Sequence, residues 1–190
     1  MLIPMGFLAA SGAGAAGAYE LISTTLITSN TASVTFNVSA YASTYKHLQI
    51  RAIARGTQTY GHGTYIQCNN DVDTSYSAHY LRGNGATVVS ESNINNSAMV
   101  FWPTVTGTSG TTGSFGQAIY DFIDAFSSSK YKTVKTLYGM QDAGSFDRYI
   151  YLASGNWRST SAITSIILKP EGGGSFVDGS RFSIYGIKGA

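Results

Sequence analysis

Short segments in which apolar and polar residues alternate constrain the fold of this chain most strongly. The clearest is residues 46–55. Small or aliphatic residues occupy every second position of this segment: Leu48, Ile50, Ala52 and Ala54. Polar residues stand between them: His47, Gln49, Arg51 and Arg55. A period of two places successive side chains on opposite faces of a strand. The segment therefore predicts a strand with one buried and one solvent-exposed face, as in antiparallel sheets.

Runs of similar character recur along the chain and are separated by turn residues. They cover residues 19–28, 33–38, 64–69, 78–82, 86–91, 97–105, 115–126, 133–140, 148–153, 163–168 and 182–187. The sequence GTSGTTG at residues 107–113 predicts a flexible loop. Many short strands at this spacing are typical of a β-sandwich or barrel. We therefore predict one antiparallel, all-β domain over residues 19–190.

Residues 119–126 fit two patterns. Ile119, Phe122, Ile123 and Phe126 have helical spacing, but residues 118–123 also alternate with a period of two. We favour a strand that leads into a short turn. Asp121 and Asp124 then point to opposite faces of the strand, which makes them a poor acid–base pair.

The first seventeen residues carry no charged side chain. Five large apolar residues come first: Leu2, Ile3, Met5, Phe7 and Leu8. Only Ala, Gly and Ser follow, up to Gly17. Such a segment has little side-chain surface with which to offset the entropy of ordering it. We therefore expect residues 1–18 to form an extended N-terminal arm that a neighbouring subunit holds.

Two other interpretations of the arm fit less well. A signal peptide would begin with basic residues, but Lys46 is the first lysine or arginine in the chain. Residues 12–17 match the GxGxxG pattern of dinucleotide-binding proteins, which needs a following helix and an acidic residue about 20 positions further on. Strand-like residues follow instead, and residues 36–41 contain no acid. A flexible hinge explains these glycines better.

Composition excludes several classes of partner. Charged residues make up 12% of the chain, about half the usual share of roughly 25%. A net charge of +2 is too small for a nucleic-acid-binding surface, so we expect no nucleic-acid partner. No apolar run approaches the roughly 20 residues that span a membrane, so we expect no membrane partner. The single cysteine, Cys68, excludes a disulfide within the chain.

Candidate catalytic and metal-binding residues are few. The turn at residues 69–73 is rich in oxygen ligands, yet it lacks the EF-hand pattern and is explained by the preference of Asn and Asp for turns. Cys68 and His79 could form a thiol–imidazole pair, but a lone cysteine on a strand is usually a buried apolar residue. We therefore expect no catalytic residue, no metal, no cofactor and no enzymatic activity.

Aromatic residues are the remaining candidates for recognition. The candidates that can stack on a sugar ring or fill a subunit contact are Tyr60, Trp102, Tyr149, Tyr151 and Trp157, with Arg158 beside the last. Ordinary core packing is the alternative for each ring.

Four segments together resemble small β-sandwich virion proteins of tailed bacteriophages. They read YELIST (19–24), YKHLQIR (45–51), HYLRGNG (79–85) and GSRFSIYGIKG (179–189). The resemblance covers the chain from Tyr19 onward and implies a jelly-roll-like sandwich located in the virion. It further implies a capsid decoration (cement) protein, with copies of itself in a homotrimer and the major capsid protein as partners. A tail or fibre module that recognises host-surface glycan is the alternative.

Overall fold

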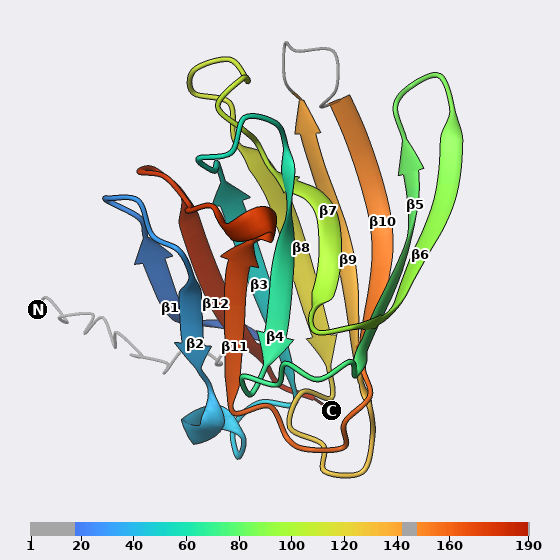
Figure 1. Ribbon diagram of the computed structural model, residues 1–190. Coiled ribbons are helices and arrows are strands. Elements are labelled where there is room, and N and C mark those ends of the chain that lie inside the picture. Colours follow the sequence, from blue (N-terminus) through green and yellow to red (C-terminus); the bar gives the residue numbers. More distant parts are fainter. Residues whose placement is uncertain (1–17, 142–147, 190) are drawn as a thin grey trace, which may run out of the picture.

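The computed structural model describes residues 18–141 and 148–189 (Figure 1). Within these ranges the chain forms twelve strands, two 3₁₀ turns and no α-helix, and hence no helix able to cross a membrane. The strands are β1 (Tyr19–Leu26), β2 (Val34–Asn37), β3 (His47–Ala54), β4 (His62–Cys68), β5 (Tyr76–Gly83), β6 (Val88–Asn96), β7 (Met99–Val105), β8 (Gly116–Ile123), β9 (Lys132–Gln141), β10 (Arg148–Trp157), β11 (Ser165–Pro170) and β12 (Arg181–Ile187). The turns are η1 (Ser39–Tyr41) and η2 (Glu171–Gly173). The predicted all-β class is confirmed.

Eight of these strands have the order of a jelly roll. The large sheet begins β1-β12-β3-β8, and the small sheet is β2-β11-β4-β7. β1 lies in the large sheet and β2, the next strand in the chain, lies in the small sheet. Their antiparallel partners, β12 and β11, cross between the same two sheets. β3 and β4 do the same with β8 and β7. The result is two antiparallel sheets packed face to face, as predicted.

Two hairpins extend the large sheet. β5–β6 lies in sequence between β4 and β7, and β9–β10 lies between β8 and β11. They continue the large sheet as β8-β9-β10-β5-β6, so its far end projects beyond the edge strand β7 of the small sheet (Figure 1). The large sheet therefore has a part that the small sheet does not cover.

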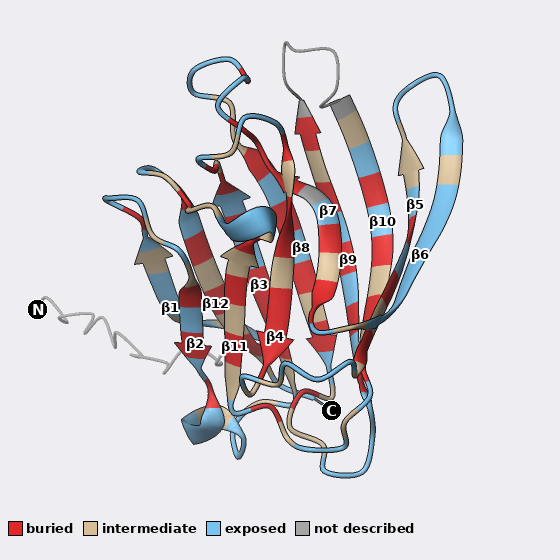
Figure 2. Ribbon diagram, in the orientation of Figure 1, coloured by how far each residue is buried: buried red, intermediate tan, exposed pale blue. Residues whose placement is uncertain are grey.

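In the strands between the edge strands β1 and β6 of the large sheet, alternate residues point into the core, which gives the banded pattern of Figure 2. Leu48, Ile50, Ala52 and Ala54 of β3 are buried, as their spacing predicts. Gln49 differs from its prediction, because it lies on the outer face but is only 6% exposed. Its amide Nε2 donates to Asp121 Oδ1 at 2.6 Å, and its Oε1 accepts from Arg51 Nε at 2.8 Å, so neighbouring polar side chains cover it.

Residues 119–126 form a strand that leads into a turn, as favoured. β8 ends at Ile123, and Asp124 follows with a φ of 48°, which ends the extended conformation. The carboxylate of Asp124 accepts from Lys130 Nζ at 2.5 Å, and its backbone N–H donates to His47 Nδ1. Asp121 lies on the outer face and accepts from Gln49, so the two carboxylates have different partners and do not form a pair.

The loop at residues 107–114 is held by Arg55 and by backbone hydrogen bonds from Thr108 and Ser109 to the oxygens of Gln58 and Thr59. The Arg55 guanidinium donates to the backbone oxygens of Thr111 (2.8 Å), Ser114 (2.9 Å) and Gly110 (3.0 Å). A planar guanidinium can reach several carbonyls at once, because its donors form a fixed fork. Arg55 thus fixes the path of a loop that its sequence alone would leave flexible.

Replacing Arg55 with alanine will loosen this loop. Since the guanidinium is partly exposed, we expect a loss of about 1–2 kcal/mol in the free energy of unfolding. Faster amide hydrogen exchange at residues 108–114 should accompany it, measured by mass spectrometry. Arg55→Lys is the matched control, since it keeps the charge and loses the fork. Unchanged exchange in Arg55→Ala would contradict this role.

Candidate functional site

Four aliphatic side chains form a row across the outer face of the large sheet. Ile119 on β8 lies directly opposite Leu137 on β9. Leu137 in turn lies opposite Leu152 on β10, and Leu152 lies opposite Leu81 on β5. Directly opposed residues share a face and their side chains touch. These four are 36%, 49%, 50% and 49% exposed. Solvent therefore reaches a continuous apolar row that spans four strands.

A second row widens this surface. Ile53 of β3 and Ile150 of β10 lie one step further along the strands and are 41% and 63% exposed. Gln117 of β8 and Gly139 of β9 stand between them, and these residues line an open hollow of about 1010 Å³ together with polar side chains such as Arg51 and Arg181. We call the six residues the apolar patch: Ile53, Leu81, Ile119, Leu137, Ile150 and Leu152. Contiguous apolar surface of this kind marks interaction sites, whereas scattered exposed aliphatic residues do not.

Polar side chains border the apolar patch. On β3 and β12, Arg51 packs its guanidinium over the ring of Tyr185, 5.0 Å from the centroid. Along the strands, the next row contains Gln49, Asp121 and Lys135, each directly opposite the next. An apolar centre with a polar rim is the usual anatomy of a protein interface.

A second group of side chains lies on the inner face of the projecting strands. We call it the tyrosine cluster: Tyr80, Arg82, Glu91, Tyr149 and Tyr151. Tyr80 and Arg82 both bond the carboxylate of Glu91, Arg82 Nη2 at 3.0 Å. These two hydrogen bonds hold the pKa of Glu91 below its usual range, although partial burial opposes them. Glu91 is therefore an anion paired with Arg82 at neutral pH.

The rings of the tyrosine cluster pack closely. Tyr151 stacks on the core residue Tyr138 with centroids 4.5 Å apart and meets the ring of Tyr80 edge-on at 5.6 Å. Arg82 lies over the ring of Tyr149 at 5.3 Å. Among the described residues, the buried Tyr151 hydroxyl and Arg82 Nε have no hydrogen-bond partner. Both atoms are buried, so these two unsatisfied polar atoms lie inside the cluster and not on its surface.

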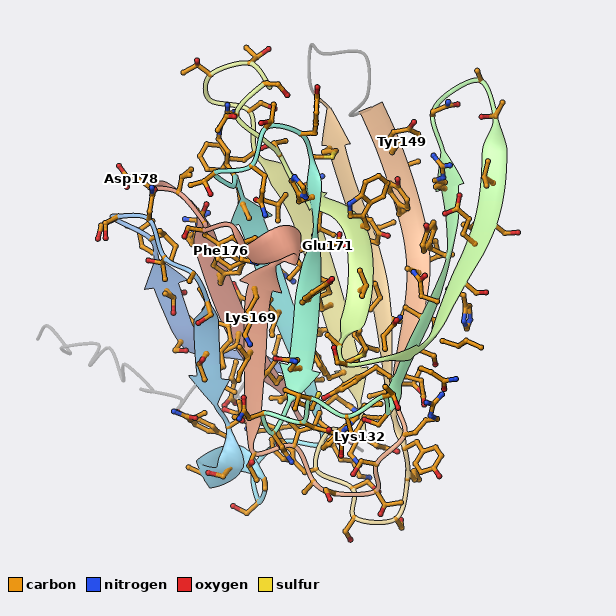
Figure 3. The ribbon with its side chains drawn as sticks, viewed as in Figure 1. Lys132, Tyr149, Lys169, Glu171, Phe176 and Asp178 are labelled. Carbon is orange, nitrogen blue, oxygen red and sulfur yellow. The ribbon has the colours of Figure 1, made fainter. Side chains whose placement is uncertain are left out.

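Trp102 and Glu171 lie next to each other on the edge of the small sheet. An added Cβ at Gly63 would come within 3 Å of both the Trp102 ring and the Glu171 carboxylate. Glu171 belongs to the short turn η2 in front of β4, where Figure 3 labels it. Tyr149, also labelled, lies at the start of β10. Burial raises the pKa of Tyr80 to about 12, and Glu171 contributes to that rise, so its charge acts on the tyrosine cluster. Trp102 itself is 42% exposed.

The other residues predicted for recognition have separate partners. Trp157 is buried, its ring stacks on Tyr76, and its Nε1 donates to Asp71 Oδ2 at 2.6 Å. No ring face of Trp157 therefore remains for a sugar. Arg158 is exposed and donates to the Thr74 backbone oxygen and to Asn95 Oδ1. Tyr60 is 60% exposed, in the loop before β4. The arm residues Leu2, Ile3, Met5, Phe7 and Leu8 lie outside the described residues.

The sequence singled out Tyr149 and Tyr151 but not their grouping with Tyr80, Arg82 and Glu91, because these residues come from distant segments. Tyr149 and Tyr151 lie on β10, and Tyr80 and Arg82 lie on β5. These two strands pair along their length, beginning with Ile150 opposite Gly83. No local spacing signals this pairing. The apolar patch was missed for a different reason: outward Leu137 stands next to inward Tyr138, and a pattern alone does not say which faces the core.

Buried titratable groups elsewhere have structural roles. The Cys68 thiol faces the core, where burial raises its pKa, whereas His79 is exposed on the outer face of the large sheet. They do not form the thiol–imidazole pair considered from the sequence. The buried amine of Lys132, labelled in Figure 3, donates to the backbone oxygens of Lys130 (2.6 Å) and Thr160 (3.3 Å). Burial lowers the pKa of Lys132.

The oxygen-rich turn at residues 69–73 uses its side chains internally. Asn69 Oδ1 accepts from the backbone N–H groups of Thr164 and Ser165. Asp71 accepts from Trp157 Nε1, from the Asp73 N–H and from Ser75 Oγ. No group of three or more His, Cys, Asp or Glu side chains that could hold a metal occurs in the part of the chain that the structure describes. These contacts explain the turn as an anchor for Trp157.

Acid will destabilise the fold through Asp71. Burial alone would raise the pKa of Asp71, but the hydrogen bonds from Trp157, Asp73 and Ser75 outweigh it and lower the pKa below 3.8. The unfolded chain therefore binds a proton at higher pH than the folded one, so this stabilisation is complete above about pH 4 and is lost as pH falls further. We expect Asp71→Asn to lower the free energy of unfolding by about 1–2 kcal/mol at pH 7 and to reduce the fall in stability below about pH 4. Urea unfolding between pH 2 and 7 measures both effects.

The exposed neighbour provides the control for this prediction. Asp73 contributes only its backbone N–H to the Asp71 carboxylate, so Asp73→Asn should keep both the stability and the acid limb. Equal effects of the two substitutions would contradict the role given to Asp71.

Comparison with protein-family models, with curated proteins and with solved structures finds no match to this chain.

Proposed function

We propose that this chain is a non-enzymatic structural protein of a tailed-bacteriophage virion, and that it serves as a capsid decoration (cement) protein. The apolar patch on the outer face of the large sheet carries the proposal. It offers six exposed aliphatic side chains on a rigid sheet, bordered by polar groups that already bond one another. A surface of this kind suits adhesion to another protein rather than chemistry on a small molecule.

Two further observations support an assembly role. Only 12% of the residues are charged, so closely packed copies repel one another little. The four segments that resemble phage virion proteins fall on or at the ends of β1, β3, β5 and β12, which all belong to the large sheet. The likeness therefore concentrates in the sheet that carries the apolar patch.

Cryo-electron microscopy of virions of the phage that encodes the chain tests this proposal. We expect density for the sandwich in repeated copies on the capsid surface, with the outer face of the large sheet against another subunit. Virions that lack the chain altogether would refute the proposal, as would turnover of a host polysaccharide that a single Asp→Asn substitution abolishes.

The tyrosine cluster supports a second candidate function, recognition of a host-surface glycan by a tail or fibre module. The partly buried ring of Tyr149, the Arg82 guanidinium over it and the Arg82–Glu91 ion pair lie together at one edge of the sandwich, and sugars bind such groups by stacking and hydrogen bonding. A glycan array probed with the intact chain tests it. Under this function, Arg82→Ala should remove the signal and Tyr60→Ala, outside the cluster, should keep it. An array without any signal would exclude it.

A further inference from the structure

We propose that residues 2–8 of a second copy of this chain bind the apolar patch. This inference rests on the proposed assembly function, because it names the surface that receives the arm. The sequence supplies a charge-free segment with five large apolar side chains in seven residues, and the structure supplies an exposed apolar row. No described part of the chain covers this row, whose four side chains are 36–50% exposed.

The two surfaces match in length. The row from Ile119 to Leu81 crosses four neighbouring strands, which spans about 14 Å at the usual strand spacing. Seven residues in an extended conformation reach about 23 Å, so residues 2–8 can cover the row and meet Ile53 or Ile150 beside it. The open hollow at Gln117 and Gly139 lies between Ile53 and Ile150, and we expect a large apolar side chain of the segment to enter it.

The point at which the chain enters the sandwich favours another copy over the same one. Ala18, whose backbone oxygen accepts from Lys188, precedes β1 at the edge of the large sheet. Residues 9–17 can extend up to about 30 Å, enough to leave the domain and reach a neighbour. To reach the patch of the same chain, they would have to cross the outer face of β12 and β3, where the side chains of Arg51 and Tyr185 pack together.

The opposite approach to the patch is more open. Beyond Leu81, the edge strand β6 presents Val88, which is 71% exposed, and Ser90 on the same face. A segment that arrives from a neighbouring copy over β6 meets this uncharged rim first. The geometry therefore suits exchange of arms between adjacent copies.

Cross-linking between full-length chains tests the inference. One copy carries Phe7→Cys, and a differently tagged copy carries Leu137→Cys in the centre of the patch. The control partner is Thr133→Cys, which lies on the same strand and face but outside the patch. The native Cys68 is buried and does not compete. After mixing and treatment with a short bismaleimide, we expect at least tenfold more covalent heterodimer with Leu137→Cys than with Thr133→Cys.

Three results would overturn the inference: equal yields at the two positions, no heterodimer at either, or only an intrachain product when Phe7→Cys and Leu137→Cys are combined in one chain. The last result would place the arm on its own sheet. These failures are distinguishable from failure of the proposed function, which is decided by whether virions contain the chain. A chain present in virions without the cross-link would keep the assembly function and exclude this docking surface.

Discussion

The double substitution Leu137→Glu and Leu152→Glu is expected to abolish self-association of the chain while the sandwich stays folded. Both leucines lie in the centre of the apolar patch and are about half exposed in the single chain. Association covers the rest of each side chain, and the substituted carboxylates would be buried without a partner, which is costly. Together these effects amount to about 3 kcal/mol or more, which weakens association roughly 100-fold.

Light scattering after size-exclusion chromatography measures this effect as a fall to the mass of one chain. The effect on folding should stay within about 2 kcal/mol, because outward-facing positions of a strand tolerate polar residues and the repulsion between the two directly opposed glutamates adds at most about 1 kcal/mol. Ser92→Glu on β6 is the matched control, since it adds a charge to the same face outside the patch. Self-association retained in the double variant would show that another surface joins the copies.

Phe101→Ala should produce the largest loss of stability, about 3–5 kcal/mol in the free energy of unfolding. Phe101 lies on β7 and is fully buried, with its ring 5.6 Å from Tyr120 and 6.3 Å from Tyr138. Its edge also packs against the backbone of Gly155 on β10, where a Cβ would come within 2.7 Å. The side chain thus joins the small sheet to the inserted hairpin β9–β10.

Urea unfolding measures this loss as a lower midpoint at an unchanged slope. Val100→Ala is the control on the same strand, because Val100 is half-buried and points away from the core, and it should cost about 1 kcal/mol or less. A similar loss in the two variants would mean that the inserted hairpins are not held through Phe101.

Local patterns in the sequence were sufficient to locate the strands but not to pair them. All twelve were predicted, because a period of two is set by the pleat of each strand. Their ends were less accurate: β6 runs on to Asn96, beyond the predicted 91, since pairing with β5 extends it around the bulge at Asn95. The jelly-roll order depends on pairings such as β1 with β12, which lie far apart in the chain.

The side chains at the candidate sites were harder to predict than the strands. Trp157 beside Arg158 has the composition of a surface site, yet the carboxylate of Asp71 satisfies its indole N–H and allows the ring to enter the core. Leu137 and Ile119 have the composition of core residues, yet both face solvent. In each case a contact between distant segments decides which side is buried, and a local pattern does not contain that information.

The most direct test of the central claim, that the outer face of the large sheet joins copies of the chain, is sedimentation equilibrium of the unmodified protein. A mass that is a multiple of 20.1 kDa at micromolar concentration, and that returns to 20.1 kDa on dilution, is the result we predict. A mass of 20.1 kDa at every concentration would contradict the claim.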